Sequence, residues 1–148
     1  MSKLFRSLGA AALVSVVAGA VLSSTVQEDR SETMKQNWAN FKPFVAVAKG
    51  EAEPLPALVG NANALEQISK RLMTLFPEGS TSDESRAKPE IWANWADFQQ
   101  KVAAFQTAVP DLVAAAKSGD KAKIGAAVKA VGGTCGACHK SYRKPKKK

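Results

Sequence analysis

Apolar residues recur at steps of three and four along most of this chain, which is the spacing of one face of an α-helix. No alternating strand pattern flanks an Asn-Gly or Asp-Gly hairpin turn. The spacing predicts a first helix from about Gln27 to Lys49, ended by Gly50 and kinked at Pro43, because proline removes a backbone donor. A second helix is predicted from about Pro54 to Phe76.

A polar loop from Pro77 to Lys88 follows the second helix, and the helical spacing then resumes. A third helix is predicted from about Pro89 to Lys117, with a bend at Pro110. A fourth is predicted from about Asp120, which suits an N-cap, to Tyr142, with Gly132-Gly133 as a weak point. Four amphipathic helices joined by modest loops predict an all-α, antiparallel four-helix bundle, a fold whose core is able to host a cofactor.

The chain opens with Lys3 and Arg6, followed by an uncharged apolar stretch and the small-x-small sequence Ala18-Gly19-Ala20. This order is typical of a secretory signal peptide, with cleavage after Ala20. An uncleaved membrane anchor is the alternative, because the uncharged stretch from Ser7 to Gln27 approaches the roughly 20 residues of a spanning helix. We therefore expect residues 1–20 to be a signal peptide and residues 21–148 to form one domain in an oxidising compartment, the periplasm.

Loss of residues 1–20 lowers the net charge from +8 to +6, and the remaining positive charge is concentrated at the C-terminus. Residues 21–139 are formally neutral, whereas residues 140–148 carry six positive charges and no acid: Lys140, Arg143, Lys144, Lys146, Lys147 and Lys148. Such a basic tail either contacts an acidic partner or an anionic membrane surface, or is a solvated chain end. No nucleic-acid-binding motif accompanies it, so no nucleic-acid partner is expected.

The only two cysteines and the only histidine of the chain stand together as Cys135, Cys138 and His139, in a Cys-x-x-Cys-His run. This run is typical of a c-type haem attachment site. The two thiols add to the haem vinyl groups, and the imidazole is placed to bind the iron. One covalently bound haem c per chain is therefore expected, on the fourth helix. The alternatives are a zinc site short of one ligand, a redox-active thiol pair and a plain disulfide.

The ligand on the other side of the iron decides what such a haem does. After loss of residues 1–20, only Met34 and Met73 remain as methionine ligands. Methionine and histidine together raise the reduction potential and suit electron transfer, whereas an open position lets iron bind small gases. A methionine on an apolar helix face is more often core packing. The same choice between haem pocket and core applies to five aromatic residues: Trp38, Trp92, Trp95, Phe98 and Tyr142.

The run from Cys135 to His139, at the C-terminal end and on the last of four predicted helices, resembles the class II cytochromes c, which include the cytochromes c prime. The resemblance covers essentially all of residues 21–148. It includes the Arg30-x-x-x-Met34 step on the first helix, Lys49-Gly50 at its end and Lys88-Pro-Glu-Ile-Trp92 at the start of the third. It also includes Val131-Gly-Gly-Thr before the haem motif and Lys-Ser-Tyr142-Arg143 after it.

The resemblance implies a low-spin iron with His139 and Met34 as axial ligands, because high-spin members typically hold an apolar residue such as leucine at the position of Met34. Arg30 and Met34 share one helix face. By the same resemblance, Arg30 lies near the haem propionates and Arg143 lies beside His139, and we expect Trp92 near the haem. Members of this family often pair through their first two helices, so a homodimer is a further expectation.

These observations predict a periplasmic monohaem c-type cytochrome that carries one electron by Fe(III)/Fe(II) cycling. It would exchange electrons with unidentified redox proteins and would not be an enzyme. The main alternative is a five-coordinate, high-spin cytochrome c prime that binds NO or CO, in which Met34 does not bind the iron. A non-haem exported helical module, with its Cys-x-x-Cys pair as a disulfide or metal clip, is the alternative from another class.

Overall fold

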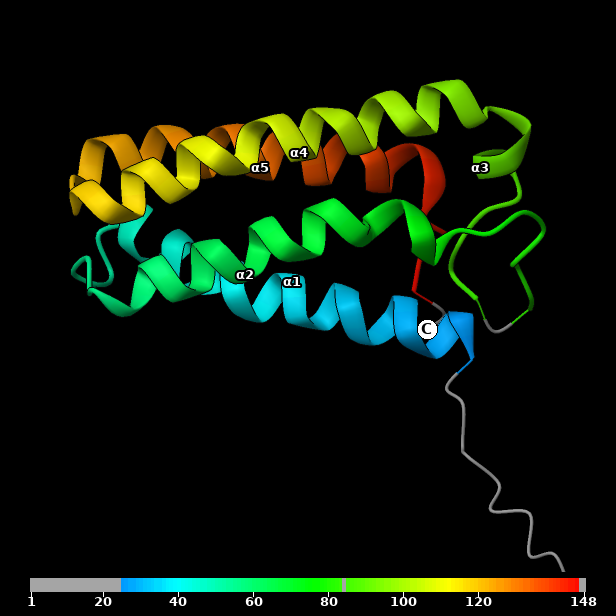
Figure 1. Cartoon of the computed structure of the whole chain (residues 1–148), viewed down its shortest axis with the longest axis horizontal. Coiled ribbons are helices and arrows are strands. Elements are labelled where there is room, and N and C mark those ends of the chain that lie inside the picture. The colour runs from blue at the N-terminus through cyan, green and yellow to red at the C-terminus, as the bar shows by residue number, and fades with distance from the viewer. Residues whose placement is uncertain (1–24, 84, 147–148) are drawn as a thin grey trace, which may run out of the picture.

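The computed structural model describes residues 25–83 and 85–146 of the 148-residue chain. Its long helices are α1 (Val26–Ala48), α2 (Ala57–Arg71), α4 (Trp95–Ser118) and α5 (Lys121–Tyr142). Figure 1 shows these four helices running lengthwise beside one another, and the described residues contain no named β-strand. The predicted all-α, antiparallel four-helix bundle is confirmed.

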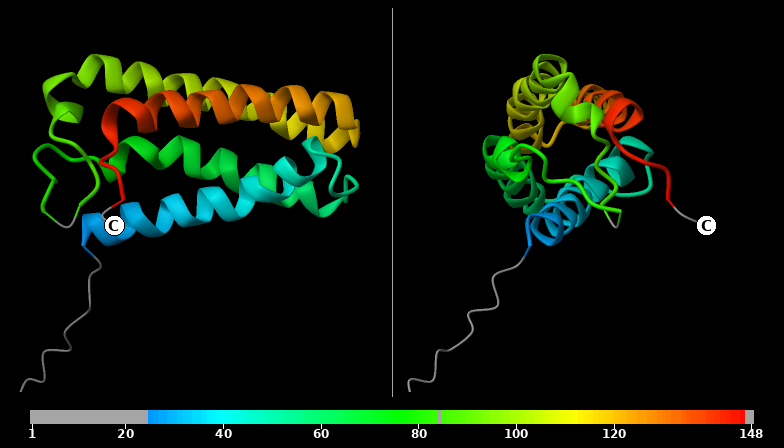
Figure 2. Two further views of the ribbon diagram at one scale, coloured as in Figure 1. Left: turned by 180° about the vertical axis from the view of Figure 1, so that it is seen from behind. Right: turned by 90° about the vertical axis from the view of Figure 1, so that its right-hand side faces the viewer.

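Each long helix packs against two others, so that the four enclose a central space when the bundle is viewed along its length (Figure 2). Helix α1 contacts α2 and α5, and α4 contacts the same two helices. Ridges of side chains from neighbouring helices interlock in such a bundle around one shared core. A residue that points inward from any of the four therefore meets side chains from the other three.

The helix ends are set by local side-chain and glycine chemistry. Helix α1 begins with a capping box in which Thr25 Oγ1 accepts from the Glu28 amide at 3.2 Å and the Glu28 carboxylate accepts from the Thr25 amide at 2.7 Å. Asp120 caps α5, as predicted, and accepts from the amides of Ala122 and Lys123. Gly119 adopts a left-handed φ of 64° just after α4, a conformation that favours glycine.

The predicted weak points do not interrupt the helices. Helix α1 continues through Pro43, and α4 continues through Pro110. Helix α5 runs through Gly132 and Gly133 to Tyr142 without a break. Packing on both sides compensates for the lost hydrogen bonds and for the flexibility of glycine, so tertiary contacts override the local preference.

Two predicted boundaries were wrong. The second helix is α-helical only to Arg71 and continues as a short 3₁₀ helix, η1 (Leu72–Leu75). The third splits into a single turn, α3 (Glu90–Ala93), and the long α4, because Asn94 leaves the helical region at φ −122° and ψ 48°. The Trp92 indole donates to the Pro77 carbonyl oxygen at 2.9 Å, which holds this turn against the end of η1 and separates it from α4.

The core has large buried side chains at both ends of the bundle. Phe44, Leu112 and Ile124 are fully buried on the helix segments nearest the loop ends at Gly50 and Gly119. At the other end, Phe98 packs against three aromatic neighbours at ring-centroid distances between 4.8 and 5.5 Å: Phe76, Trp95 and Tyr142. These two groups stabilise the two ends of the bundle, and the chain's cysteines lie on the segment of α5 next to the end at Phe98.

The alternative of a membrane anchor applies to the N-terminal stretch from Ser7 to Gln27. Among the helices of residues 25–83 and 85–146, none is long and apolar enough to span a bilayer. The predicted signal peptide, residues 1–20, lies outside the described residues.

A candidate haem site at the centre of the bundle

The three residues of the Cys-x-x-Cys-His run lie on one side of α5. Cys138 follows Cys135 by three positions and His139 follows it by four, which places all three on one helix face. Each is partly buried, and each lines the same cavity of about 380 Å³. All four long helices and η1 contribute to the rest of its wall: Met34, Asn37, Trp38, Phe41, Leu65, Leu72, Lys101, Val102, Phe105, Val131, Gly132, Thr134 and Arg143.

The register between α1 and α5 puts Met34 opposite His139. The two helices are neighbours and run in opposite directions (Figure 1), and a Cβ placed on Gly132 would lie 3.9 Å from the Phe41 ring. Met34 lies seven residues before Phe41, and His139 lies seven residues after Gly132. Seven residues span about 10 Å of helix in each case, so the thioether and the imidazole line the cavity at the same level.

The cavity has the size and the wall chemistry of a cofactor site. Its volume falls within the roughly 300–1,000 Å³ of small-molecule and cofactor sites, and its walls are mainly aliphatic and aromatic. Asn37 Oδ1 is the buried side-chain oxygen or nitrogen that has no hydrogen-bond partner within the described part of the chain, and Asn37 lines the cavity. Buried polar atoms are normally satisfied, so this acceptor indicates that a further group belongs in the cavity.

Burial keeps the three reactive side chains neutral. The pKa of His139 is lowered mainly by burial, and further by the positive charges of Arg143 and Arg86. Burial also raises the pKa of Cys135 and raises that of Cys138 to about 11. A neutral imidazole is the form that binds a metal. When haem is bound, His139 would hold the iron from α5 while Cys135 and Cys138 would hold the porphyrin edge, and the iron would supply the redox and gas-binding chemistry.

The lowered pKa of His139 makes the haem-free protein less stable in acid. The folded chain releases this proton more readily than the unfolded chain, whose histidine has a pKa near 6.5. The free energy of unfolding should therefore fall as the pH drops below 6.5 and through the lower folded-state pKa. Urea unfolding of haem-free protein from about pH 7.5 to about pH 5 measures this. His139→Asn removes the chain's only histidine, so an unchanged pH dependence in this variant would contradict the assignment.

Arg30 is held by the loop that follows η1 rather than by residues of the cavity wall. Its guanidinium donates to the Leu75 carbonyl oxygen at 3.0 Å, to Ser85 Oγ at 3.2 Å and to both the carbonyl and hydroxyl oxygens of Ser80 at 3.0 and 2.7 Å. It also lies 4.5 Å from the centre of the Phe76 ring. Desolvation lowers its pKa. Arg30 does not line the cavity, so its predicted contact with haem propionates finds no support in these bonds.

Most of the other predicted neighbours of the haem also lie elsewhere. Trp92 does not line the cavity, because its indole is hydrogen-bonded to the backbone at Pro77. Of the five aromatic residues named as candidates, Trp38 is the one in the wall. Met73 packs against the core outside the wall. Arg143, by contrast, lines the cavity with His139.

Among the polar residues of the cavity wall, sequence reasoning missed Asn37 and Lys101. Asn37 follows Met34 by three positions and so shares its helix face; that spacing was the available signal. Lys101 reaches the cavity from α4 while its ammonium lies 3.5 Å from Asp97. Nothing in the sequence relates Lys101 to the cysteines, because the contact joins two different helices.

The alternatives to haem receive no support from the geometry. The described residues contain no group of three or more histidine, cysteine, aspartate and glutamate side chains arranged to hold a metal ion. Cys135 and Cys138 are both free thiols. The site therefore consists of two thiols and an imidazole that face an apolar cavity from the last helix of a four-helix bundle.

This arrangement defines a class II c-type cytochrome. The chain belongs to the cytochrome c′ family, whose profile matches residues 25–143. It is 38% identical over 109 residues to a cytochrome c′ of Alcaligenes xylosoxydans, covering 73% of this chain and 84% of the relative. It is 36% identical over 128 residues to a cytochrome c-556 of Agrobacterium fabrum, covering 85% and 86%. Proteins of this family carry haem c.

Solved structures agree with the fold and with the family. A carbon monoxide-bound variant of cytochrome c prime from Alcaligenes xylosoxidans matches with a TM-score of 0.75 and 35% identity, over 81% of this chain and 94% of that one. A nitric oxide complex of another variant matches with a TM-score of 0.74 at the same identity and the same coverage. The comparisons confirm a monohaem cytochrome of this family, and they give the predicted low-spin, methionine-ligated branch no support.

Proposed function

We propose that this protein holds one haem c through Cys135 and Cys138, with His139 as an iron ligand, and that the opposite face of the iron binds NO or CO. The single observation that carries the haem assignment is that these three side chains line one apolar cavity. The protein binds a ligand and converts no substrate. The predicted signal peptide, residues 1–20, supports a periplasmic location.

Gas binding is the function that the comparisons favour. Related proteins of the same fold at 35% identity have been solved with carbon monoxide and with nitric oxide bound. Both molecules are small and nearly apolar, so the aliphatic and aromatic wall of the cavity suits them. Access to the iron then depends on the side chain that stands opposite His139.

Electron transfer with His139 and Met34 as axial ligands is a second candidate, and the register of α1 and α5 favours it. Met34 lines the cavity at the level of His139. A thioether in that position is a ligand for haem iron and raises its reduction potential. The two candidates differ in whether Met34 binds the iron or leaves the sixth coordination position of the iron open to gas.

The visible spectrum of the ferrous holoprotein, with and without CO, distinguishes the two candidates. We expect the wild-type spectrum to shift with CO and Met34→Leu to respond in the same way, because the sixth position is open in both. If wild type does not respond and Met34→Leu does, Met34 is a ligand and electron transfer becomes the function. Met73→Leu is the matched control, since Met73 lies in the core outside the cavity wall.

A further inference from the structure

Two distant segments are joined at the C-terminal end of α5. Ala87 and Arg143 form an isolated antiparallel bridge. The Lys88 amide donates to the Tyr142 carbonyl oxygen at 3.0 Å, and the Lys144 amide donates to the Arg86 carbonyl oxygen at 2.8 Å. The Arg86 guanidinium donates two hydrogen bonds to the Lys144 carbonyl oxygen, at 3.0 and 2.8 Å. The loop before α3 is thereby fastened to the end of the chain.

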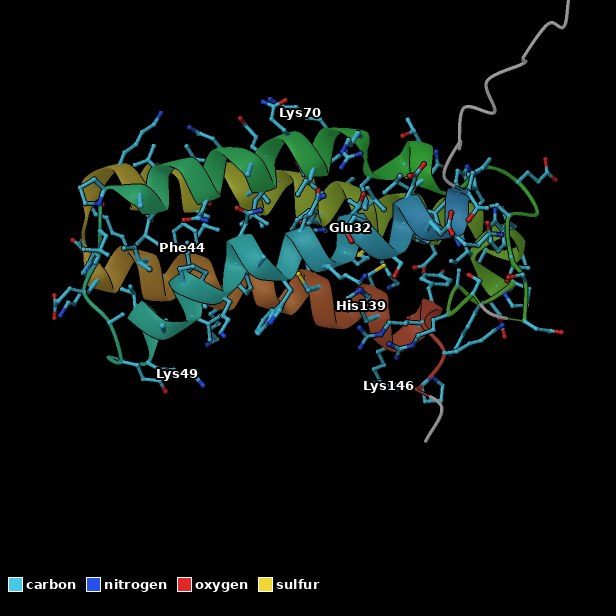
Figure 3. The ribbon with its side chains drawn as sticks, turned by 90° about the horizontal axis from the view of Figure 1, so that it is seen from below. Glu32, Phe44, Lys49, Lys70, His139 and Lys146 are labelled. Carbon is cyan, nitrogen blue, oxygen red and sulfur yellow. The ribbon has the colours of Figure 1, made fainter. Side chains whose placement is uncertain are left out.

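This junction gathers five positive side chains, here called the basic rim: Arg86, Lys88, Lys140, Arg143 and Lys144. The rim borders the candidate haem site, because Arg143 lines the cavity and Lys140 directly follows His139. Figure 3 shows His139 between α1 and α5, with the chain end toward Lys146 on the same side of the molecule. The positive charge is thus a folded surface beside the cofactor site rather than only a trailing end.

Among the described residues, no acidic side chain forms an ion pair with the basic rim. The ion pairs between described residues join other side chains and include none of the five. Residues 121–148 contain no aspartate or glutamate. Lys88, Arg86 and Lys144 donate to backbone carbonyl oxygens instead. Like charges held together repel one another and create a positive potential that attracts an acidic surface.

We propose that the basic rim is the docking surface for an acidic redox protein that exchanges one electron with the haem iron. The proposal rests on the haem assignment above. It holds whether Met34 or a gas molecule takes the sixth position of the iron, because a gas-binding iron must also be reduced. In each encounter one electron passes between the two proteins. The haem iron changes between Fe(III) and Fe(II), and the redox centre of the partner gains or loses the same electron. The charge borders the cavity that would hold the haem, which is where such a partner has to bind.

The composition of the rim favours a protein over a membrane surface. Stable binding to a bilayer uses inserted apolar side chains or lipid anchors in addition to positive charge. The large apolar side chains that are well exposed in the described residues are Trp38 and Leu55, and neither belongs to the rim. Charge without an apolar element suits a rapid, salt-sensitive encounter between proteins.

The test compares electron transfer to reagents of opposite charge. The double variant Lys140→Glu/Lys144→Glu leaves three positive and two negative side chains in the rim, and Lys123→Glu/Lys129→Glu makes the same charge change at two exposed residues nearer the N-terminal end of α5. Ferrous holoprotein is oxidised in a stopped-flow mixer by hexacyanoferrate(III), an anion, and by tris(phenanthroline)cobalt(III), a cation. Each reagent takes one electron from the iron. Only variants with a full covalent haem band enter the comparison.

We expect the lower positive charge of the rim variant to slow oxidation by hexacyanoferrate(III) roughly tenfold at low salt and to speed oxidation by the cobalt complex, with the effect disappearing in about 0.5 M salt. Poly-L-glutamate should slow the first reaction in wild type but not in the rim variant. The control pair should change both rates less than twofold. Equal effects of the two variants, or salt-resistant binding of wild type to phosphatidylglycerol vesicles, would overturn the proposal.

Failure of this proposal is distinguishable from failure of the haem assignment. A wild-type chain without covalent haem would give no oxidation signal and would overturn the assignment itself. A normal haem band with oxidation rates that do not depend on the charge of the rim would leave the haem assignment intact and reject only the docking surface.

Discussion

Replacing Cys135 and Cys138 together with serine should abolish covalent haem attachment completely. These are the only cysteines in the chain, and a thioether bond to haem requires their sulfur atoms. Each single serine variant leaves one anchor, so haem remains attached but more weakly retained. The measurement is haem staining after denaturing electrophoresis, together with the mass of the intact exported protein.

Ser141→Ala is the matched control for this experiment, because it removes an exposed hydroxyl from the same helix without touching the motif. It should keep the full haem mass. If wild type carried no haem and the cysteines were joined or held another metal, the non-haem alternative would replace the present assignment. A double serine variant that still carried haem through a covalent bond would contradict the role of both thiols.

Replacing Arg30 with methionine should lower the free energy of unfolding by about 2–3 kcal/mol. The guanidinium is buried and donates to Leu75, Ser80 and Ser85, and methionine would leave the two carbonyl oxygens without these donors. Loss of the contact with the Phe76 ring adds to the effect. Urea unfolding followed by circular dichroism measures the change.

The matched control is Lys35→Met on the same helix, since that side chain is 73% exposed and should change stability by less than about 0.5 kcal/mol. Comparing haem-free and haem-loaded protein separates two roles of Arg30. A stability loss in both states indicates that the arginine holds the loop. A loss confined to the haem-loaded protein would instead favour the predicted contact with the haem propionates.

Local patterns in the sequence were sufficient for the elements of the fold. The three- and four-residue spacing of apolar positions placed four helices, and Asp120 and Gly50 marked ends that the structure has. The errors fall where a distant contact changes the backbone. The split at Asn94 accompanies a bond from Trp92 to Pro77, 15 positions away, and no periodicity within the third segment reports that bond.

The candidate site also has a part that follows from the sequence and a part that only the packed structure decides. Cys135, Cys138 and His139 are nearly contiguous, so their chemistry and their shared helix face follow from spacing alone. Arg30 was placed near the haem by resemblance, whereas in the structure its side chain reaches a loop about 50 positions later. An arginine on a helix face has several partners within reach, and only the packed structure selects among them.

The sequence by itself determined the attachment chemistry, the helical architecture and the excess of positive charge, because each depends on residues close together in the chain. Tertiary structure alone decided that Met34 stands level with His139, because this depends on how α1 and α5 pack at Phe41 and Gly132. The tertiary structure also pairs Ala87 with Arg143, and this brings the basic chain end beside Arg86 and Lys88 to form the basic rim. Such contacts arise only when helices far apart in sequence pack in one register.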